Sequence, residues 1–368
     1  MIQTDFFENI EEQLSNELPL VVYRKPKEVT LKVIFQDEDD LVSVKDFTET
    51  GFVFAPFDQE KPTLLLRPDQ FFELETFDTE DYDSKHTLPF IDVDEKKEFH
   101  LRLVENGLAE IERGNFDKVV LSRCLRVPME SKPLNLFKKL LGKYENAFCY
   151  LWYHPKVGLW MGATPEILLR VENKKMTTIS LAGTQKFREN ENIKWEKKEL
   201  KEQKFVTDYI VDALEGKVSN LTLGETESIR AGNLLHLRTK ISANLNDDGL
   251  NNVLKALHPT PAVCGLPRKS SEDFILANEN YAREFYTGYL GELNFKVERK
   301  RNSRRANQEN QVYRSISKQS TLFVNLRCLK LLGNEVLIYV GGGITKESDP
   351  ENEWDETVSK SKTMLNIL

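Results

Sequence analysis

The sequence predicts an α+β protein in which antiparallel strands alternate with helices. Three observations support this prediction. Short apolar runs, separated by acidic and proline-containing turns, recur along residues 1–95 and again along 147–185. From residue 194 the apolar residues take up the period of a long helix. Hydrophobic residues make up 40% of the 368-residue chain, which is enough to form a sizeable core.

The N-terminal half is predicted to be rich in strands. Four apolar runs in residues 1–95 are typical of strands in a mostly antiparallel sheet, namely LPLVVYR, LKVIFQ, GFVFAPF and PTLLLRP. A helix pattern follows at 95–113, and the strand-like segment KVVLSRCLRV occupies 118–127. Residues 147–185 predict a meander of strands.

Helix patterns dominate the next part of the chain. The segment KWEKKELKEQKFVTDYIVDAL, which begins at residue 194, predicts a long helix, and a second helix is predicted at 248–257. A third helix is expected to begin at Ser270, where Ser270 and Asp273 can form a capping box. The basic segment from Lys296 to Arg305 is expected to be a solvated loop.

The C-terminal part is predicted to contain two strands and a helix. The strands are TLFVNLRCLKL and EVLIYVGGGIT. The helix start is well marked, because Asp349 can serve as the N-cap, Pro350 suits the first helical position and acidic residues follow.

The bulk properties exclude several classes of function. A net charge of −8 argues against a dedicated nucleic-acid binder. The four cysteines, Cys124, Cys149, Cys264 and Cys328, are scattered, as expected for buried thiols in a reducing compartment. No apolar run approaches the roughly 20 residues of a membrane span, and the first residues lack the basic start of a signal peptide. We therefore expect a cytoplasmic protein without a membrane or nucleic-acid partner.

Glu202 is a candidate metal ligand on the predicted long helix. Stepping back four residues from Val206 places Glu202 on the inward face, and a buried carboxylate is costly unless it is paired or binds a cation. Alternatively, Glu202 lies beyond the core or pairs with a neighbouring lysine. The expected apolar stripe consists of Phe205, Val206, Tyr209, Ile210, Ala213 and Leu214.

The last helix presents a similar carboxylate. Glu356 and Lys360 are four residues apart on one helix face, and Glu353 lies near them. These residues can form an ordinary exposed ion pair. However, the helix follows three glycines, Gly341–Gly343, whose bare amides can approach an anionic ligand. A tight turn is the alternative explanation of the glycines.

Three further residues are candidates when they are taken together. Arg327 lies within an apolar strand pattern, where it either faces solvent or binds a carboxylate. Lys118 opens the strand KVVLSR, and Glu166 follows the turn GATP. Each of these residues alone is more typical of an exposed charge.

Six segments in order resemble the chorismate-using enzymes, a family that includes isochorismate, salicylate, anthranilate and aminodeoxychorismate synthases. They are KVVLSR (118–123), GATPE (162–166), LAGT (181–184), HPTPAVCG (258–265), FVNLRC (323–328) and VGGGITKESDPENEWDETVSK (340–360). The motif region spans 116–360, whereas residues 1–95 resemble the family only in strand pattern. The resemblance implies one domain over 1–368, built of two antiparallel sheets with helices outside and the active site between them.

The resemblance also implies roles for individual residues. Lys118 resembles the base that activates water, and Glu166 resembles the general acid. Glu202 and Glu356 resemble ligands of Mg²⁺, although histidines commonly flank the first of these glutamates in the family and do not do so here. The residues that resemble substrate contacts are Gly183, Thr184, His258, Arg327, Gly341 and Lys360.

Within the family, the residues favour isochorismate synthase. Ala182 stands where aminodeoxychorismate synthases have a nucleophilic lysine, and no Arg-Asn-Asp sequence follows the metal helix, so neither ammonia nor a glutaminase subunit is expected. Salicylate synthase is the main alternative, but its aspartate is absent near Tyr286–Gly291. Anthranilate synthase component I and a non-catalytic binding protein are weaker alternatives. We expect a monomer that acts on chorismate in menaquinone or siderophore biosynthesis.

Overall fold

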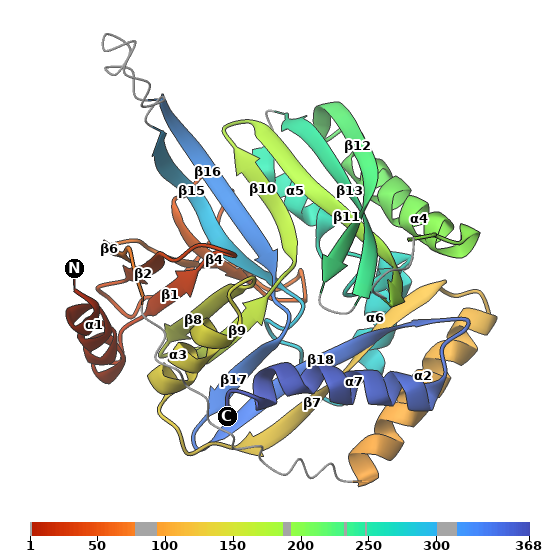
Figure 1. The fold of residues 1–368 in the computed structure, drawn as a ribbon, viewed down its shortest axis with the longest axis horizontal. Coiled ribbons are helices and arrows are strands. Elements are labelled where there is room, and N and C mark those ends of the chain that lie inside the picture. The colour runs from red at the N-terminus through yellow and green to blue at the C-terminus, as the bar shows by residue number, and fades with distance from the viewer. Residues whose placement is uncertain (1, 78–93, 187–192, 232–233, 247–248, 300–314) are drawn as a thin grey trace.

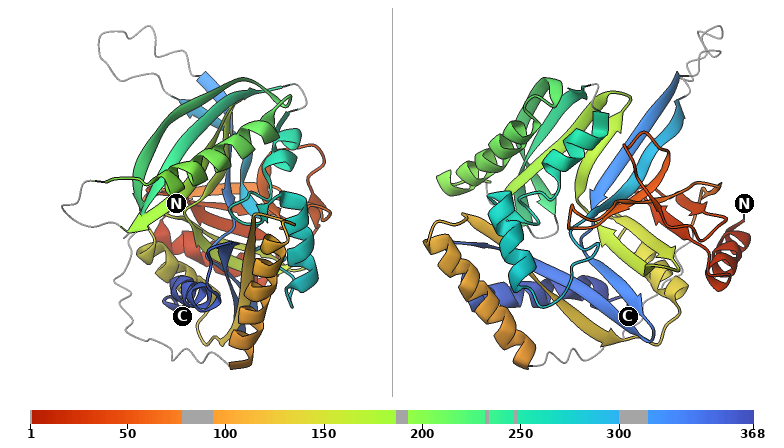
Figure 2. Two further views of the ribbon diagram at one scale, coloured as in Figure 1. Left: turned by 90° about the vertical axis from the view of Figure 1, so that its right-hand side faces the viewer. Right: turned by 180° about the vertical axis from the view of Figure 1, so that it is seen from behind.

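In the part of the chain that the structure describes, two antiparallel sheets of nine strands each form the protein (Figure 1). The computed structural model describes residues 2–77, 94–186, 193–231, 234–246, 249–299 and 315–368. Helices lie on the outer faces of the two sheets (Figures 1 and 2). The predicted α+β architecture of two sheets with helices outside is therefore confirmed.

We name the sheets A and B, and give their strands in spatial order. Sheet A consists of β14 (Gly265–Leu266), β7 (Lys118–Pro128), β18 (Glu335–Thr345), β17 (Cys328–Leu332), β9 (Gly158–Thr164), β8 (Phe148–His154), β1 (Leu20–Arg24), β2 (Leu31–Phe35) and β6 (Gln70–Leu74). Sheet B consists of β12 (Val218–Ala231), β13 (Leu234–Leu245), β11 (Lys175–Lys186), β10 (Ile167–Glu172), β16 (Ser315–Val324), β15 (Tyr289–Arg299), β4 (Gly51–Ala55), β5 (Leu64–Leu66) and β3 (Val42–Ser43).

The helices bury apolar faces against these sheets. In the described residues they are α1 (Gln3–Ser15), α2 (Asp94–Glu112), α3 (Pro133–Lys143), α4 (Lys197–Leu214), α5 (Gly249–Leu257), α6 (Arg268–Asn278) and α7 (Pro350–Leu365). Helices α4 and α5 pack on sheet B, and α2 and α7 pack on the β7–β18 part of sheet A. None of the helices in this part of the chain combines the length and apolarity that a bilayer crossing demands.

An aromatic core fills the space between the sheets. Its largest fully buried side chains include Tyr23, Phe52, Phe54, Phe148, Tyr150, Trp152, Trp160, Phe323 and Tyr339. Many of these rings contact one another edge-on or stacked, for example Phe148 and Phe323 with centroids 4.2 Å apart. This core holds the two sheets together.

The four apolar runs predicted in the N-terminal part are strands, but they do not share one sheet. Strands β1 and β2 belong to sheet A, whereas β4 and β5 belong to sheet B. The reason is the position of their partners, because β1 pairs with β8 and β4 pairs with β15. The N-terminal segment therefore contributes to both layers.

The buried carboxylate of Glu292 joins the two sheets. Glu292 on β15 of sheet B accepts a hydrogen bond from the Tyr23 hydroxyl of sheet A at 2.7 Å. It also forms ion pairs with Lys25 and, at 3.5 Å, with Lys32. Burial raises the pKa of Glu292, but the two lysines outweigh burial and hold the pKa below its ordinary value.

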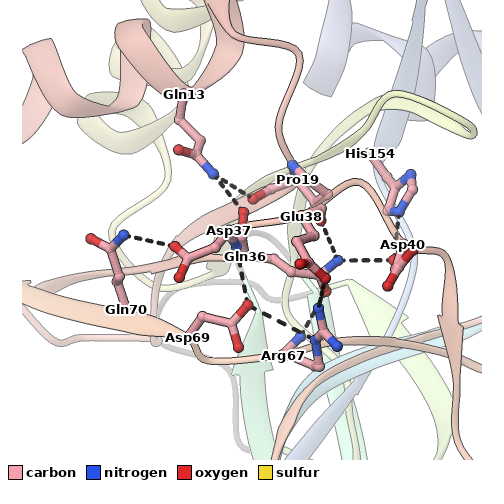
Figure 3. Close-up of polar contacts among 10 residues, drawn as sticks. All are labelled: Gln13, Pro19, Gln36, Asp37, Glu38, Asp40, Arg67, Asp69, Gln70 and His154. Carbon is pink, nitrogen blue, oxygen red and sulfur yellow. Dashed lines mark hydrogen bonds and ion pairs between the residues drawn. The ribbon is translucent and has the colours of Figure 1, made fainter.

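A second polar cluster fixes the N-terminal loops around the fully buried Gln36 (Figure 3). The Gln36 side chain donates to the carbonyls of Glu38 and Asp40 at 2.7 and 2.8 Å, and accepts from the amide of Arg67 at 3.1 Å. Gln13 of α1 donates to the Gln36 carbonyl at 2.9 Å. These bonds give the buried amide of Gln36 its partners and tie the loops to one another.

The segment TLFVNLRCLKL is not the single strand that we predicted. Strand β16 ends at Val324 in sheet B, and β17 begins at Cys328 in sheet A. Asn325 forms the corner, because its side chain accepts from Tyr150 Oη at 2.6 Å and donates to the Phe285 carbonyl at 2.9 Å. Arg327 adopts a left-handed φ of 47° as the chain crosses between the sheets.

Two smaller predictions were wrong. Helix α6 begins at Arg268 rather than at Ser270, and Ser270 Oγ donates to the Pro267 carbonyl instead of forming a capping box with Asp273. Residues 296–299 are the end of β15 rather than a loop, because they pair with β16, and residues 300–305 lie outside the described part of the chain.

The predicted start of the last helix is confirmed. Asp349 is the N-cap of α7, and its side chain accepts from the Asn352 amide at 3.0 Å. Pro350 occupies the first helical position.

Candidate active site

Two neighbouring chain crossings between the sheets position Glu166 and Arg327. The chain passes from β9 to β10 at Glu166, and from β16 to β17 at Arg327. Backbone hydrogen bonds tie the two crossings together, since Val324 N donates to Glu166 O and Ala163 N donates to Arg327 O, each at 3.0 Å. The turn that precedes Glu166 therefore lies beside the corner that ends at Arg327.

Lys118 reaches the same region from the first position of β7. It pairs with Thr345 of β18 and extends along the strand toward Gly343. A Cβ on Gly343 would lie 2.9 Å from Lys118 Cε, so the missing side chain makes room for the lysine. Burial lowers the pKa of Lys118, while the charges of Glu202 and Glu166 oppose that shift.

Glu166 is half-buried, and its pKa is shifted in the direction opposite to that of Lys118. Burial raises the pKa of Glu166 to about 6, against the opposing charges of Lys118, Arg327 and Lys360. A carboxylic acid with this pKa keeps a protonated fraction near neutral pH. The site therefore brings together an amine that is easier to deprotonate and a carboxyl group that is easier to protonate.

Helix α7 presents carboxylates to the glycines of β18. A Cβ on Gly342 would lie 3.0 Å from Glu353 Oε2 and 3.8 Å from Glu356 Oε1. Lys360 pairs with Glu356 at 2.6 Å and donates to the Gly341 carbonyl at 2.9 Å. Glu356 and Lys360 thus form the ordinary i, i+4 ion pair, and the pair lies beside Gly341 and Gly342 of β18.

The face of α4 that packs on sheet B is shifted by one residue from the face that we predicted. Its inward face consists of Gln203, Thr207, Ile210 and Leu214. Phe205 is 50% exposed and Glu202 is also exposed, so neither lies on the inward face. Gln203 takes the inward position because its amide donates to Ser180 and Thr239 within the sheet. Glu202 is exposed, and its charge acts on Lys118.

Gly183 allows α4 to approach sheet B closely. It has a left-handed φ of 69° at a bulge in β11, and a Cβ there would lie 3.1 Å from the Glu199 carbonyl. Thr184 pairs with His236 through the backbone. A side chain at position 183 would push the carboxylate-bearing end of α4 away.

On α4 and α7, two buried carboxylate oxygens lack partners in the described residues, as Glu49 Oε2 does in the N-terminal part. The two on the helices are Glu199 Oε2 on α4 and Glu353 Oε2 on α7. Each lies three residues before the glutamate that we predicted as a metal ligand, so each helix has a pair of acids on one face. This repeated spacing is the sequence signal that could have identified Glu199.

These carboxylates fit a hard divalent cation. Unpaired buried oxygens are costly unless a cation or a donor reaches them, and Mg²⁺ binds through one or two carboxylates together with waters and substrate oxygens. No group of three or more His, Cys, Asp or Glu side chains close enough to hold a metal is found among the described residues. The acids are instead divided between α4 and α7.

His258 lies apart from the charged group. It is buried, and its ring bonds to the Pro56 carbonyl at 3.0 Å and packs edge-on against Tyr289. Burial lowers the pKa of His258 to about 4, so the imidazole is neutral. The rest of the HPTPAVCG segment is nearer the acid, because Thr260 and Glu166 line one mainly apolar cavity of about 200 Å³.

The fold and the site together define an enzyme with a lysine and a carboxylic acid of opposite pKa shift, placed where the chain crosses between two sheets. Comparison with known proteins agrees with this class. Residues 61–298 match the family described as chorismate binding enzyme, and residues 311–366 match a second family of the same description. The chain belongs to the chorismate-binding enzyme family.

The relatives include isochorismate synthases. MenF of Escherichia coli (strain K12) is 31% identical over 278 residues, which cover 73% of this chain and 59% of MenF. The match thus spans less than two thirds of the length of MenF. DhbC of Bacillus subtilis (strain 168) is 28% identical over 339 residues, which cover 85% of this chain and 79% of DhbC.

Solved structures show the same fold. DhbC from Bacillus anthracis superposes with a TM-score of 0.74 at 23% identity, covering 97% of this chain and 98% of that one. MenF from Escherichia coli gives a TM-score of 0.72 at 23% identity, with coverages of 94% and 88%.

Proposed function

We propose that the protein is a Mg²⁺-dependent isochorismate synthase, which adds water to C2 of chorismate and expels the C4 hydroxyl. The observation that carries this proposal is the shared site of Lys118 and Glu166, whose pKa values shift in opposite directions. The reaction needs a base for the attacking water and an acid for the leaving hydroxyl. The names of the relatives MenF and DhbC support the same reaction.

Lys118 acts as the base in this proposal. Burial favours its neutral amine, which can take a proton from water as the oxygen attacks C2. Gly343 has no side chain to displace the lysine, so the amine keeps its place beside β18.

Glu166 acts as the acid. Its protonated form donates to the C4 oxygen, which leaves as water. After one turnover Lys118 is protonated and Glu166 is ionised, so a proton must return from the lysine to the glutamate, directly or through solvent. The reaction consumes one water and releases one, and it needs no oxidant or co-substrate.

Cationic groups and backbone amides would bind the two carboxylates of chorismate. Arg327 lies beside Glu166, and Lys360 lies at the glycines of β18. An arginine suits a planar carboxylate because its guanidinium can donate two parallel hydrogen bonds. Gly183, Thr184 and Gly341 would add contacts through their backbone.

Glu202 and Glu356 would hold Mg²⁺, with Glu199 and Glu353 beside them. The bound ion would supply positive charge to a substrate carboxylate and act as a Lewis acid. The unpaired oxygens of Glu199 and Glu353 support this assignment, because a cation or its water ligands would satisfy them.

The identity of the product tests the proposal. The purified protein is incubated with chorismate and Mg²⁺, and the products are separated by chromatography, with a lactate-dehydrogenase assay for pyruvate. We expect isochorismate with little salicylate or pyruvate, formed without a glutaminase subunit. Stoichiometric pyruvate would identify a salicylate synthase instead. Isochorismate from this enzyme would serve menaquinone or siderophore biosynthesis.

A further inference from the structure

Arg123 is a buried cation in the KVVLSR segment that the proposed chemistry does not use. It is 7% exposed and lies on β7, five residues after Lys118. Successive side chains of a strand point to opposite faces, so Arg123 lies on the face opposite to Lys118. That face of β7 is covered by α2 and α6, while α7 packs on the neighbouring strand β18.

The guanidinium of Arg123 binds two side chains of α7. Its Nε donates to Thr357 Oγ1 at 2.7 Å, and its Cζ lies 3.9 Å from the centroid of the Trp354 ring. Trp354 is 5% exposed and Thr357 is fully buried. The imidazole of His100 on α2 packs on Trp354 as well, with centroids 5.8 Å apart.

These two contacts fix the rotation of α7 about its axis. Trp354 and Thr357 are three residues apart, so they lie on one face of the helix, and each directly follows a carboxylate. Successive helix residues are about 100° apart, so holding Trp354 and Thr357 against β7 fixes the direction of Glu353 and Glu356. Those glutamates then point toward Gly342.

We propose that Arg123 is a positioning residue, which sets the rotation and height of α7 on sheet A and thereby the affinity of its carboxylates for Mg²⁺. The inference rests on the proposed function, since it takes Glu353 and Glu356 to be the metal-binding acids. Arginine is suited to the task because its guanidinium is planar. One face can stack on an indole while the N–H groups donate in the guanidinium's own plane, which a lysine cannot do.

The test compares Mg²⁺ binding to the wild type, Arg123→Lys and Trp354→Leu by titration calorimetry in the absence of substrate. We expect the dissociation constant for Mg²⁺ to rise about 10- to 100-fold in both variants, as for other residues that orient metal ligands. Activity should recover at high Mg²⁺, with kcat and the KM for chorismate within roughly threefold of wild type. Trp354→Phe keeps an aromatic face and should restore most of the affinity.

Met364→Ala is the matched control. Met364 is 1% exposed at the other end of α7, so its truncation should loosen the helix and lower the melting temperature without removing the Arg123 contacts. Its Mg²⁺ affinity should equal that of the wild type. Unchanged affinity in Arg123→Lys, or an equal loss in Met364→Ala, would overturn the inference.

The outcome also separates this inference from the proposed function. A wild type that binds Mg²⁺ but makes no isochorismate would refute the proposed reaction, while the comparison of affinities would still decide the role of Arg123. A wild type that binds no Mg²⁺ would refute the metal assignment and this inference with it.

Discussion

At the scale of single residues, the site depends on two groups whose protonation is shifted by burial. Lys118 is pushed toward its neutral form and Glu166 toward its protonated form, although each is the other's counter-charge. Burial outweighs the attraction between them. This balance leads to predictions that separate charge from proton transfer.

Lys118→Arg should lose nearly as much activity as Lys118→Ala. Arginine keeps the positive charge but cannot release its proton near neutral pH, because its pKa exceeds about 12. Chorismate should still bind to the arginine variant. The measurement is kcat together with chorismate affinity for both variants. An arginine variant that keeps most of the wild-type kcat would make Lys118 an electrostatic anchor rather than the base.

Glu166→Gln should be slower but more stable. The amide cannot deliver a proton, so kcat should fall by roughly 10²- to 10⁴-fold. The pKa of Glu166 is raised from 4.5 to about 6, so the folded state binds more protons than the unfolded state between these values. The contribution of Glu166 to wild-type stability therefore falls as the pH rises from about 4 to 7, by about 2 kcal/mol.

A glutamine at position 166 cannot ionise, so the variant does not lose stability as the pH rises through the pKa of Glu166. Denaturant unfolding should show Glu166→Gln to be more stable than wild type at pH 8 and of similar stability at pH 4. An equal difference between the two proteins at both pH values would mean that the effect does not arise from ionisation of Glu166.

At the scale of elements, the buried ion pair of Glu279 and Arg283 completes the edge of sheet A beside β7, the strand that begins with Lys118. Strand β14 pairs with only the first two residues of β7. Beyond it, Arg283 Nη2 donates to the Val120 carbonyl at 2.6 Å, and Glu279 Oε1 accepts from the Ser122 amide at 2.8 Å. The two side chains also bind each other, so they take the place of a neighbouring strand.

Removing one member of this pair should strongly destabilise the protein. Glu279→Gln or Arg283→Met leaves the other charge buried without its partner, which costs about 3–5 kcal/mol. The double variant should lose less than the sum of the single losses, because it leaves no lone charge. The free energies of unfolding of the four proteins form the test, and strict additivity would contradict it. Lys269→Met, which breaks the exposed pair with Asp273, is the control and should have little effect.

The sequence predicted most of the elements, because each one depends on its own local pattern. Helices α2, α4, α5 and α7 were recognised from apolar periodicity, and the start of α7 from Asp349 and Pro350. The break at Arg327 was missed, since Asn325 forms the corner through contacts with Tyr150 and Phe285 that are remote in sequence. The allocation of β1 and β4 to different sheets was missed for the same reason.

The sequence motifs shared with the family predicted most of the residues that meet in the site. The structure brings Lys118, Glu166, Arg327, Glu356 and Lys360 into one region, and places Glu202 near enough to act on Lys118. The sequence misjudged the rotation of α4, because the polar bonds of Gln203 rather than the apolar pattern determine its inward face.

At the scale of the whole molecule, the acids of the proposed metal site belong to both layers. Glu202 and Glu199 are on α4 against sheet B, while Glu356 and Glu353 are on α7 against sheet A. A cation bound to both pairs would cross-link the layers. Mg²⁺ should therefore raise the melting temperature, by the equivalent of about 2.7 kcal/mol at one hundred times its dissociation constant.

Chelation and substitution test this link. EDTA should abolish activity and remove the thermal shift, and Glu202→Gln or Glu356→Gln should weaken both effects. Glu225→Gln on the exposed edge of sheet B is a control that should leave both unchanged. Full turnover in EDTA would contradict the metal assignment.

The bond between Tyr23 and Glu292 has a consequence for synthesis of the chain. The two residues are 269 positions apart, so a ribosome adding 5–20 residues per second needs roughly 10 to 50 s to make the carboxylate after the tyrosine. During that time Lys25 and Lys32 have no Glu292, and β4 has no β15 beside it. Strand β4 thus keeps an open edge until β15 has been made, whereas β1 can pair with β8 much earlier. The open edge makes β4 a target for chaperones and for aggregation.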